Sequence, residues 1–179
     1  MARKFRLRQL LPFSFAALLS GCTGVPEGVE PITGFELDRY LGTWYEVARL
    51  DHRFERGLSE VTANYSLREE SGVQVVNRGF NAAKGEWKEA DGKAFFIDEP
   101  DVGRLKVSFF GPFYGAYNII ELDQDDYQYS MITGPNRSYL WILARQPELD
   151  PDTLERLVAR AAGLGFATDE LIYVEHKQR

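Results

Sequence analysis

The chain has 179 residues and carries 21 basic and 27 acidic side chains, which gives a formal net charge of −6. This acidic balance argues against nucleic acid as a partner, because nucleic acids are bound through clusters of Lys and Arg. The length fits a single domain with a sizeable core, and the aromatic share of 13% favours strands or an apolar site.

Residues 1–21 have the composition of a secretory signal peptide. Four basic residues lie within the first eight positions, an apolar run follows over 10–19, and the small residues Ser20 and Gly21 come next. The apolar run is shorter than the roughly 20 residues that a membrane-spanning helix needs. We therefore predict that 1–21 is a signal peptide.

Cys22, the only cysteine, follows this segment directly. The sequence Leu19-Ser20-Gly21-Cys22 resembles the lipobox of bacterial lipoproteins, in which the signal is cut before the cysteine and the thiol is acylated. The alternative is an ordinary signal peptide with an incidental cysteine. We predict a palmitate-type acyl anchor on Cys22 that holds the protein on a membrane. Thr23 resembles an outer-membrane sorting signal, so the predicted location is the bacterial outer membrane.

Residues 23–34 are rich in Gly and Pro and have no apolar periodicity, which is typical of a linker. We expect residues 22–34 to be the acylated cysteine and a tether. Twelve extended residues reach about 40 Å, enough to hold a domain clear of lipid headgroups. The folded domain is expected over 35–179.

From residue 43 onward, short apolar runs alternate with turn signals. The eight predicted strands cover 43–50, 61–67, 72–80, 93–97, 104–110, 116–122, 127–133 and 138–145. This pattern indicates an all-β sandwich or a meandering barrel.

After the eighth strand the apolar period changes to that of a helix. Asp150 and Pro151 suit the N-cap and the first turn, and apolar residues recur at i, i+3, i+4 and i+7 from Leu154. The glycines beyond residue 162 are expected to end the helix. A last short strand is predicted over 171–176.

Two short sequences about 100 residues apart resemble the lipocalin signature. Gly42-Thr43-Trp44 opens the first strand, and Arg145 ends the eighth. In lipocalins this arginine packs across the tryptophan ring and closes the barrel, which is a favourable cation–π pair. The stretches YLGTWYEVARLDHRFERGL, LKVSFFGPFYGAYNII and YLWILAR look like the bacterial outer-membrane lipocalins, relatives of apolipoprotein D.

This resemblance covers about residues 35–176 and implies the fold and the ligand class. The implied fold is all-β: an eight-stranded up-and-down antiparallel barrel with a C-terminal helix packed outside and a final short strand. The implied ligand is a fatty acid or lysophospholipid, which the barrel binds and stores or transports in the envelope. No cofactor is expected.

The alternation of strand residues predicts which side chains face the interior. Because Arg145 must reach the bottom of the barrel, Tyr139, Trp141 and Leu143 share the inner face. Matching the related barrels position by position implies a ligand-binding set of Tyr65, Leu67, Asn77, Leu105, Val107, Phe109, Tyr117, Trp141 and Leu143. Each of these side chains could instead fill the barrel as core, so both interpretations stay open.

The segment 51–60 is long for a hairpin turn and carries His52, Arg53 and Arg56 around Phe54. In lipocalins the corresponding loop folds over the mouth of the barrel. Arg53 and Arg56 are therefore candidates for contact with a phosphate or carboxylate headgroup. A solvated surface loop is the simpler interpretation and is favoured.

Motifs for catalysis and metal binding are missing. Two His and one Cys offer no metal-ligand cluster, and no G-x-S-x-G or phosphate-binding loop occurs. We predict no catalytic residues, no metal and a non-enzymatic binding protein. The alternatives are an envelope enzyme of esterase or isomerase type and an interaction protein with a filled barrel.

Overall fold

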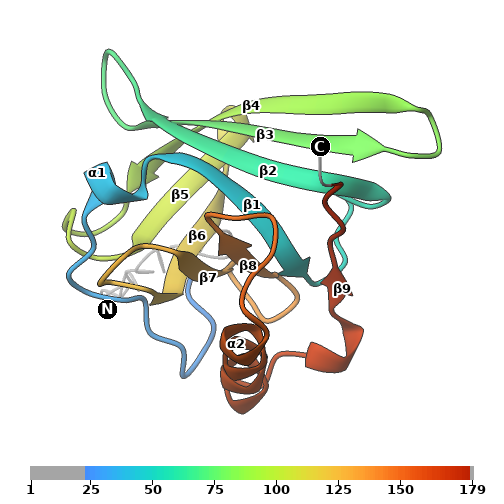
Figure 1. The fold of residues 1–179 in the computed structure, drawn as a ribbon. Helices are drawn as coiled ribbons and strands as arrows, with labels where there is room; N and C mark the ends of the chain where they lie inside the picture. The colour runs from blue at the N-terminus through green and yellow to red at the C-terminus, as the bar shows by residue number, and fades with distance from the viewer. Residues whose placement is uncertain (1–22, 178–179) are drawn as a thin grey trace, which may run out of the picture.

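The computed structural model describes residues 23–177, so the predicted signal peptide and Cys22 lie outside the described residues. One antiparallel sheet closes on itself because β1 (Gly42–Arg49) pairs with both β2 (Leu58–Leu67) and β8 (Leu140–Ala144), as Figure 1 shows. No helix among the described residues is long and apolar enough to cross a bilayer.

The strands follow one another around the barrel in chain order. The other barrel strands are β3 Val73–Asn81, β4 Glu86–Phe96, β5 Arg104–Phe110, β6 Phe113–Leu122 and β7 Tyr129–Thr133. A ninth strand, β9 (Ile172–Tyr173), pairs with the end of β1. The predicted eight-stranded up-and-down antiparallel barrel is therefore confirmed.

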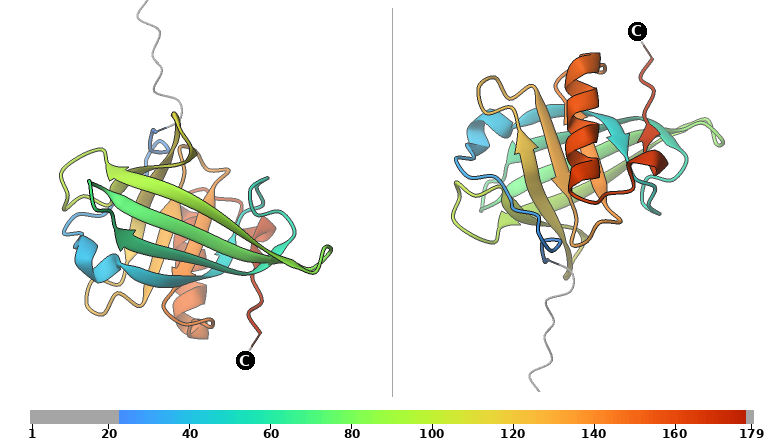
Figure 2. Two further views of the ribbon diagram at one scale, coloured as in Figure 1. Left: turned by 90° about the horizontal axis from the view of Figure 1, so that it is seen from above. Right: turned by 90° about the horizontal axis from the view of Figure 1, so that it is seen from below.

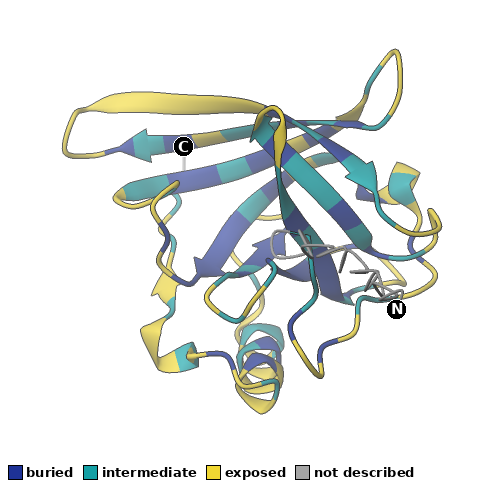
Figure 3. Ribbon diagram, turned by 180° about the vertical axis from the view of Figure 1, so that it is seen from behind, coloured by how far each residue is buried: buried dark blue, intermediate teal, exposed yellow. Residues whose placement is uncertain are grey.

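Strand β4 is twice as long as the 93–97 segment that the sequence predicts. Its first part, residues 86–91, is exposed on both faces and extends with β3 as a hairpin beyond the body of the barrel (Figure 3). The register with β3 is unbroken from Asn81↔Glu86 onward. A strand with two solvated faces has no apolar alternation, so the sequence pattern could not show it.

The predicted C-terminal helix is present as α2 (Pro151–Gly163), which lies against the outside of the barrel (Figure 2). The Asp150 carboxylate caps it by accepting a hydrogen bond from the Thr153 backbone N–H at 3.0 Å. Leu157 and Ala161 on its inner face are fully buried. A short 3₁₀ helix, η1 (Thr168–Glu170), then leads to β9.

Residues 23–34 are fixed along the barrel and do not form the expected tether (Figure 2, right). The Asn118 amide donates to the Gly24 carbonyl at 3.0 Å, and the backbones of Ile32 and Ile119 are joined by a 2.9 Å bond. Val29, a residue of this segment, is itself buried. This segment is held mainly by irregular backbone hydrogen bonds, which require no regular spacing of apolar residues. The sequence pattern therefore resembled that of a free linker.

The bottom of the barrel is closed by Trp44 and Arg145. Trp44 is fully buried, and the guanidinium carbon of Arg145 lies 4.0 Å from the centroid of its ring system. Arg145 also donates to the backbone carbonyls of Thr43 at 3.1 Å and Arg39 at 2.6 Å. Gly42 has a φ of +96°, and a Cβ there would lie 3.4 Å from Arg145 Nη1, so glycine suits this position.

A short helix that the sequence did not reveal, α1 (Leu37–Tyr40), completes this closed end. Its last residue, Tyr40, is buried with its ring 4.6 Å from that of Trp44, and its carbonyl accepts the Trp44 indole N–H at 2.8 Å. A four-residue helix has too few apolar positions to show a period.

We expect Arg145→Ala to lower the free energy of unfolding by about 2–3 kcal/mol, because it removes the cation–π contact and the bonds to the carbonyls. Urea denaturation measures this. Arg156→Ala is the control, since Arg156 is an exposed cation 5.1 Å from the Tyr129 ring centroid. Equal losses in the two variants would contradict a closing role for Arg145.

Candidate ligand-binding cavity

The barrel encloses a cavity of about 740 Å³, lined by side chains from all eight barrel strands and from the loop between β1 and β2. Sites for small organic ligands have volumes of this order. The described side chains therefore do not fill the interior, in contrast to the filled-barrel alternative.

Most of the side chains predicted to face the interior line this cavity. They are Tyr65, Asn77, Leu105, Val107, Phe109, Tyr117, Trp141 and Leu143. Tyr139 lines it too, as the parity of Arg145 predicts. Whether these residues contact a ligand stays a prediction.

Leu67 is a correction, because it is 61% exposed and does not line the cavity. Strand alternation places it on the same side as Tyr65. However, Tyr65 already pairs with Gly42, the first residue of β1. The end of β2 therefore runs past the closed bottom of the barrel, where no β1 residue lies beside it.

Three tyrosine hydroxyls meet at the floor of the cavity. The Tyr117 hydroxyl lies 2.8 Å from those of both Tyr40 and Tyr65, and Tyr40 donates to Ser130 Oγ at 3.3 Å. Burial raises the pKa of Tyr40 to about 12 and raises the pKa values of Tyr65 and Tyr117 well above the usual value. The floor is thus polar and uncharged.

A buried ion pair supports the loop between β1 and β2. Arg49 Nη1 lies 2.6 Å from Glu46 Oε1, and Arg49 Nη2 donates to the carbonyls of Glu55 at 3.1 Å and Leu58 at 3.2 Å. Burial raises the pKa of Glu46, the neighbouring Glu55 charge raises it further, and Arg49 opposes both. Arg49 thereby fixes the backbone of the loop at both of these carbonyls.

Glu55 connects this loop to β8. Its Oε2 accepts the Trp141 indole N–H at 3.1 Å and lies 3.0 Å from His52 Nε2, a contact that is too poorly aligned to be a hydrogen bond. Burial favours the neutral acid, but the interactions with His52 and Trp141 prevail and lower the pKa of Glu55. Glu55 therefore serves as the charged acceptor of the cavity wall.

The sequence analysis did not identify the polar cavity residues Glu46 and Glu55, although strand alternation could have predicted the first of them. Glu46 lies two residues after Trp44 on β1, so strand alternation points it into the barrel. Glu55 lies in a loop, where no period applies. Both line the cavity.

The structure places the two arginines considered for headgroup contact outside the cavity, and their contact with a headgroup stays a prediction. Arg53 and Arg56 are exposed, and neither lines the cavity. Arg56 instead pairs with the Asp51 carboxylate at 2.6 Å. The residues of this loop that do line the cavity are His52, Phe54 and Glu55.

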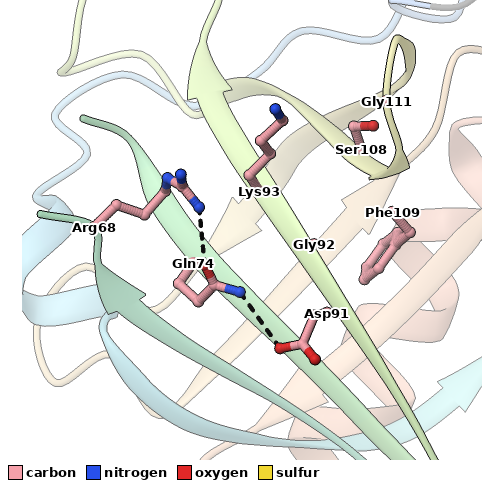
Figure 4. Close-up of a pocket in the computed structure, with 8 residues that line it drawn as sticks. All are labelled: Arg68, Gln74, Asp91, Gly92, Lys93, Ser108, Phe109 and Gly111. Atoms are coloured by element: carbon pink, nitrogen blue, oxygen red, sulfur yellow. Dashed lines mark hydrogen bonds between the residues drawn. The ribbon is translucent and has the colours of Figure 1, made fainter. Parts of the chain in front are cut away.

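A second, smaller hollow of about 260 Å³ lies beside β3 and β4 (Figure 4). Three of its polar side chains are joined to one another: Arg68 donates to Gln74 at 2.9 Å, and Gln74 donates to Asp91 at 3.5 Å. Lys93 and Ser108 also line it, and Ser108 Oγ has no hydrogen-bond partner within the described residues. Within residues 23–177 no group of His, Cys, Asp and Glu is arranged to hold a metal ion. The large cavity is therefore the candidate site.

Comparison with known proteins identifies the family. Residues 35–176 match the family model described as a lipocalin-like domain. The chain belongs to the lipocalin family. The resemblance inferred from Trp44 and Arg145 is therefore confirmed.

The relatives of this lipocalin include bacterial envelope proteins. The outer membrane lipoprotein Blc of Vibrio cholerae is 51% identical over 96% of this chain and 100% of its own length. Apolipoprotein D of Bos taurus is 34% identical over 69% of this chain and 67% of its own. The predicted location at the outer membrane is thus confirmed.

Solved structures confirm the fold of this lipocalin. Insecticyanin from the tobacco hornworm Manduca sexta superposes with a TM-score of 0.68, covering 87% of this chain and 88% of its own, at 19% sequence identity. At this identity the likeness concerns the barrel alone.

We expect Tyr117→Phe to lower the free energy of unfolding by about 1–3 kcal/mol, because it removes the hydroxyl that joins Tyr40 and Tyr65. Urea denaturation measures this. Tyr114→Phe on the same strand is the control, since the Tyr114 hydroxyl has no hydrogen bond within residues 23–177. An equally large decrease in the free energy of unfolding of Tyr114→Phe would mean that the hydrogen bonds of the hydroxyl cluster do not stabilise the fold.

Glu46→Gln should change how stability depends on pH. The folded-state pKa of Glu46 is raised above its unfolded value of 4.5, so the folded state holds the proton longer. The wild-type free energy of unfolding therefore falls as pH rises from about 4.5 through the folded pKa, by at most about 1.4 kcal/mol per pH unit. The variant should lack this slope.

Urea denaturation at a series of pH values above about 4.5 tests this dependence, because the raised folded-state pKa of Glu46 places the change in stability there. Glu99→Gln is the control, because Glu99 is exposed. A Glu46→Gln protein whose stability follows the wild-type pH profile would show that Glu46 ionises normally.

Proposed function

We propose that this lipocalin binds a monoacyl lipid, a fatty acid or lysophospholipid, reversibly inside the barrel and stores or carries it at the outer membrane. The observation that carries the proposal is the 740 Å³ cavity, which is closed at one end and lined largely by apolar and aromatic side chains. The proposed activity is binding and not catalysis.

The size of the hydrophobic effect supports an acyl ligand. Burying about sixteen carbons at about 0.8 kcal/mol each contributes about 13 kcal/mol. Association costs at least about 4 kcal/mol of lost freedom. The remainder, at most about 9 kcal/mol, corresponds to dissociation constants of about 0.3 µM or weaker.

The entrance of the cavity suits an acyl chain. Three phenylalanines line the cavity and are nevertheless largely exposed: Phe54 (76%), Phe110 (80%) and Phe113 (78%). An apolar edge of this kind lowers the free energy of a hydrocarbon chain as it leaves a lipid surface. The acyl anchor predicted on Cys22 would keep this entrance close to its source of ligand.

A cavity-filling substitution tests the proposal. The protein used is the chain from residue 22 onward with Cys22→Ser, which prevents acylation. It is delipidated and then titrated with oleate and with oleoyl lysophosphatidylcholine, and tryptophan emission reports binding. We expect one-to-one binding in the micromolar range, and at least about tenfold weaker binding in Val107→Trp, whose indole would occupy the cavity.

Lys106→Trp is the matched control, because residue 106 is the neighbour of Val107 on β5 and does not line the cavity. It should bind both lipids like the parent. A folded parent protein that binds neither lipid would overturn the proposed function. Hydrolysis of an ester substrate during these titrations would favour the enzyme alternative.

A further inference from the structure

Three buried polar atoms of the cavity wall have no hydrogen-bond partner within the described residues: Asn77 Oδ1 and both ring nitrogens of His52. His52 lines the cavity and is 6% exposed, and its Nδ1 makes no hydrogen bond with any described residue. Its Nε2 lies 3.0 Å from Glu55 Oε2. A buried polar atom without a partner is unfavourable, so the position of Nδ1 suits a group that the ligand supplies.

The Glu55 carboxylate determines which nitrogen carries the hydrogen. An ionised carboxylate only accepts hydrogen bonds, and in neutral imidazole one nitrogen donates while the other accepts. Glu55 therefore favours the hydrogen on Nε2. The Nδ1 atom is then left as an acceptor.

The imidazole ring is held in a fixed place. Its centroid lies 5.0 Å from the Trp141 ring, 5.7 Å from Phe54 and 6.1 Å from Tyr139. Trp141 is itself fixed by its bond to Glu55. An acceptor that is already positioned loses little freedom when it binds a partner.

The surroundings of His52 disfavour an anionic group. Glu46 and Glu55 both line this cavity, so a ligand carboxylate beside His52 would meet carboxyl groups, whereas the cations that line it, Arg78 and Lys88, lie on β3 and β4. The buried Arg49 guanidinium does not line the cavity, although its Nε also lacks a partner. The wall near His52 thus favours an uncharged hydrogen-bond donor.

We propose that His52 determines specificity at the polar end of the ligand, where its Nδ1 accepts a hydrogen bond from a lipid hydroxyl. This inference rests on the proposed lipid binding and deepens it. The ligand chemistry it selects is a monoacylglycerol unit, free or within a phospholipid, in preference to an acyl chain without a hydroxyl.

Two uncharged lipids isolate this hydrogen bond. Monolaurin and methyl laurate carry the same acyl chain, but only monolaurin has hydroxyls. Both are titrated against the Cys22→Ser chain loaded with the fluorescent apolar probe N-phenyl-1-naphthylamine. We expect monolaurin to displace the probe at about fivefold lower concentration, the effect of one neutral hydrogen bond.

Two substitutions separate the nitrogens of His52. His52→Gln places an amide where Nε2 lies, which keeps a donor for Glu55 and removes the Nδ1 acceptor. His52→Asn places an amide where Nδ1 lies, which keeps the acceptor and removes the contact with Glu55. The preference for monolaurin should vanish in His52→Gln and persist in His52→Asn.

Each outcome decides between the proposals. A His52→Gln protein that still prefers monolaurin, or a parent that binds both lipids equally, would overturn the role of His52 while lipid binding stands. If neither lipid displaces the probe, and oleate and lauroyl lysophosphatidylcholine also fail, both proposals fall. Tighter binding of lauroyl lysophosphatidylcholine than of monolaurin would indicate that the hydroxyl bound by His52 belongs to a lysophospholipid.

Discussion

The barrel depends on the Arg145 guanidinium stacked on Trp44. The same side chain donates to carbonyls of three separate segments, those of Arg39, Thr43 and Tyr127. One cation therefore joins the short helix, the first strand and the turn before β7 at a single point. Because the strands are tied together here, the other end can stay open without a filled core.

The open end is organised by a different kind of interaction. Arg49 is almost fully inaccessible, and its guanidinium contacts the Glu46 carboxyl group, the Glu55 carbonyl in the loop and the Leu58 carbonyl at the start of β2. A buried ion pair contributes little net stability, because removal of both charges from water opposes their attraction. What it contributes here is position: the loop, Glu55, Trp141 and His52 are fixed relative to the cavity.

The sequence predicted those parts of the site that follow strand alternation. Trp141 and Leu143 face inward because Arg145 sets the parity of β8. Parity cannot show where a strand leaves the barrel, so the placement of Leu67 failed. Within the loop, His52 lines the cavity and Arg53 is exposed, and a loop has no periodic pattern from which these placements could be predicted.

The fixed segment 23–34 changes the physical meaning of the anchor. A tether of twelve residues would let the barrel tumble freely within about 40 Å of the membrane. Instead, the first described residue is already bonded, since the Thr23 carbonyl accepts from Arg104. If Cys22 carries acyl chains, one or two residues of slack, about 7 Å, separate lipid and barrel. Such a protein would diffuse in the plane of the membrane with a restricted tilt and almost no independent rotation.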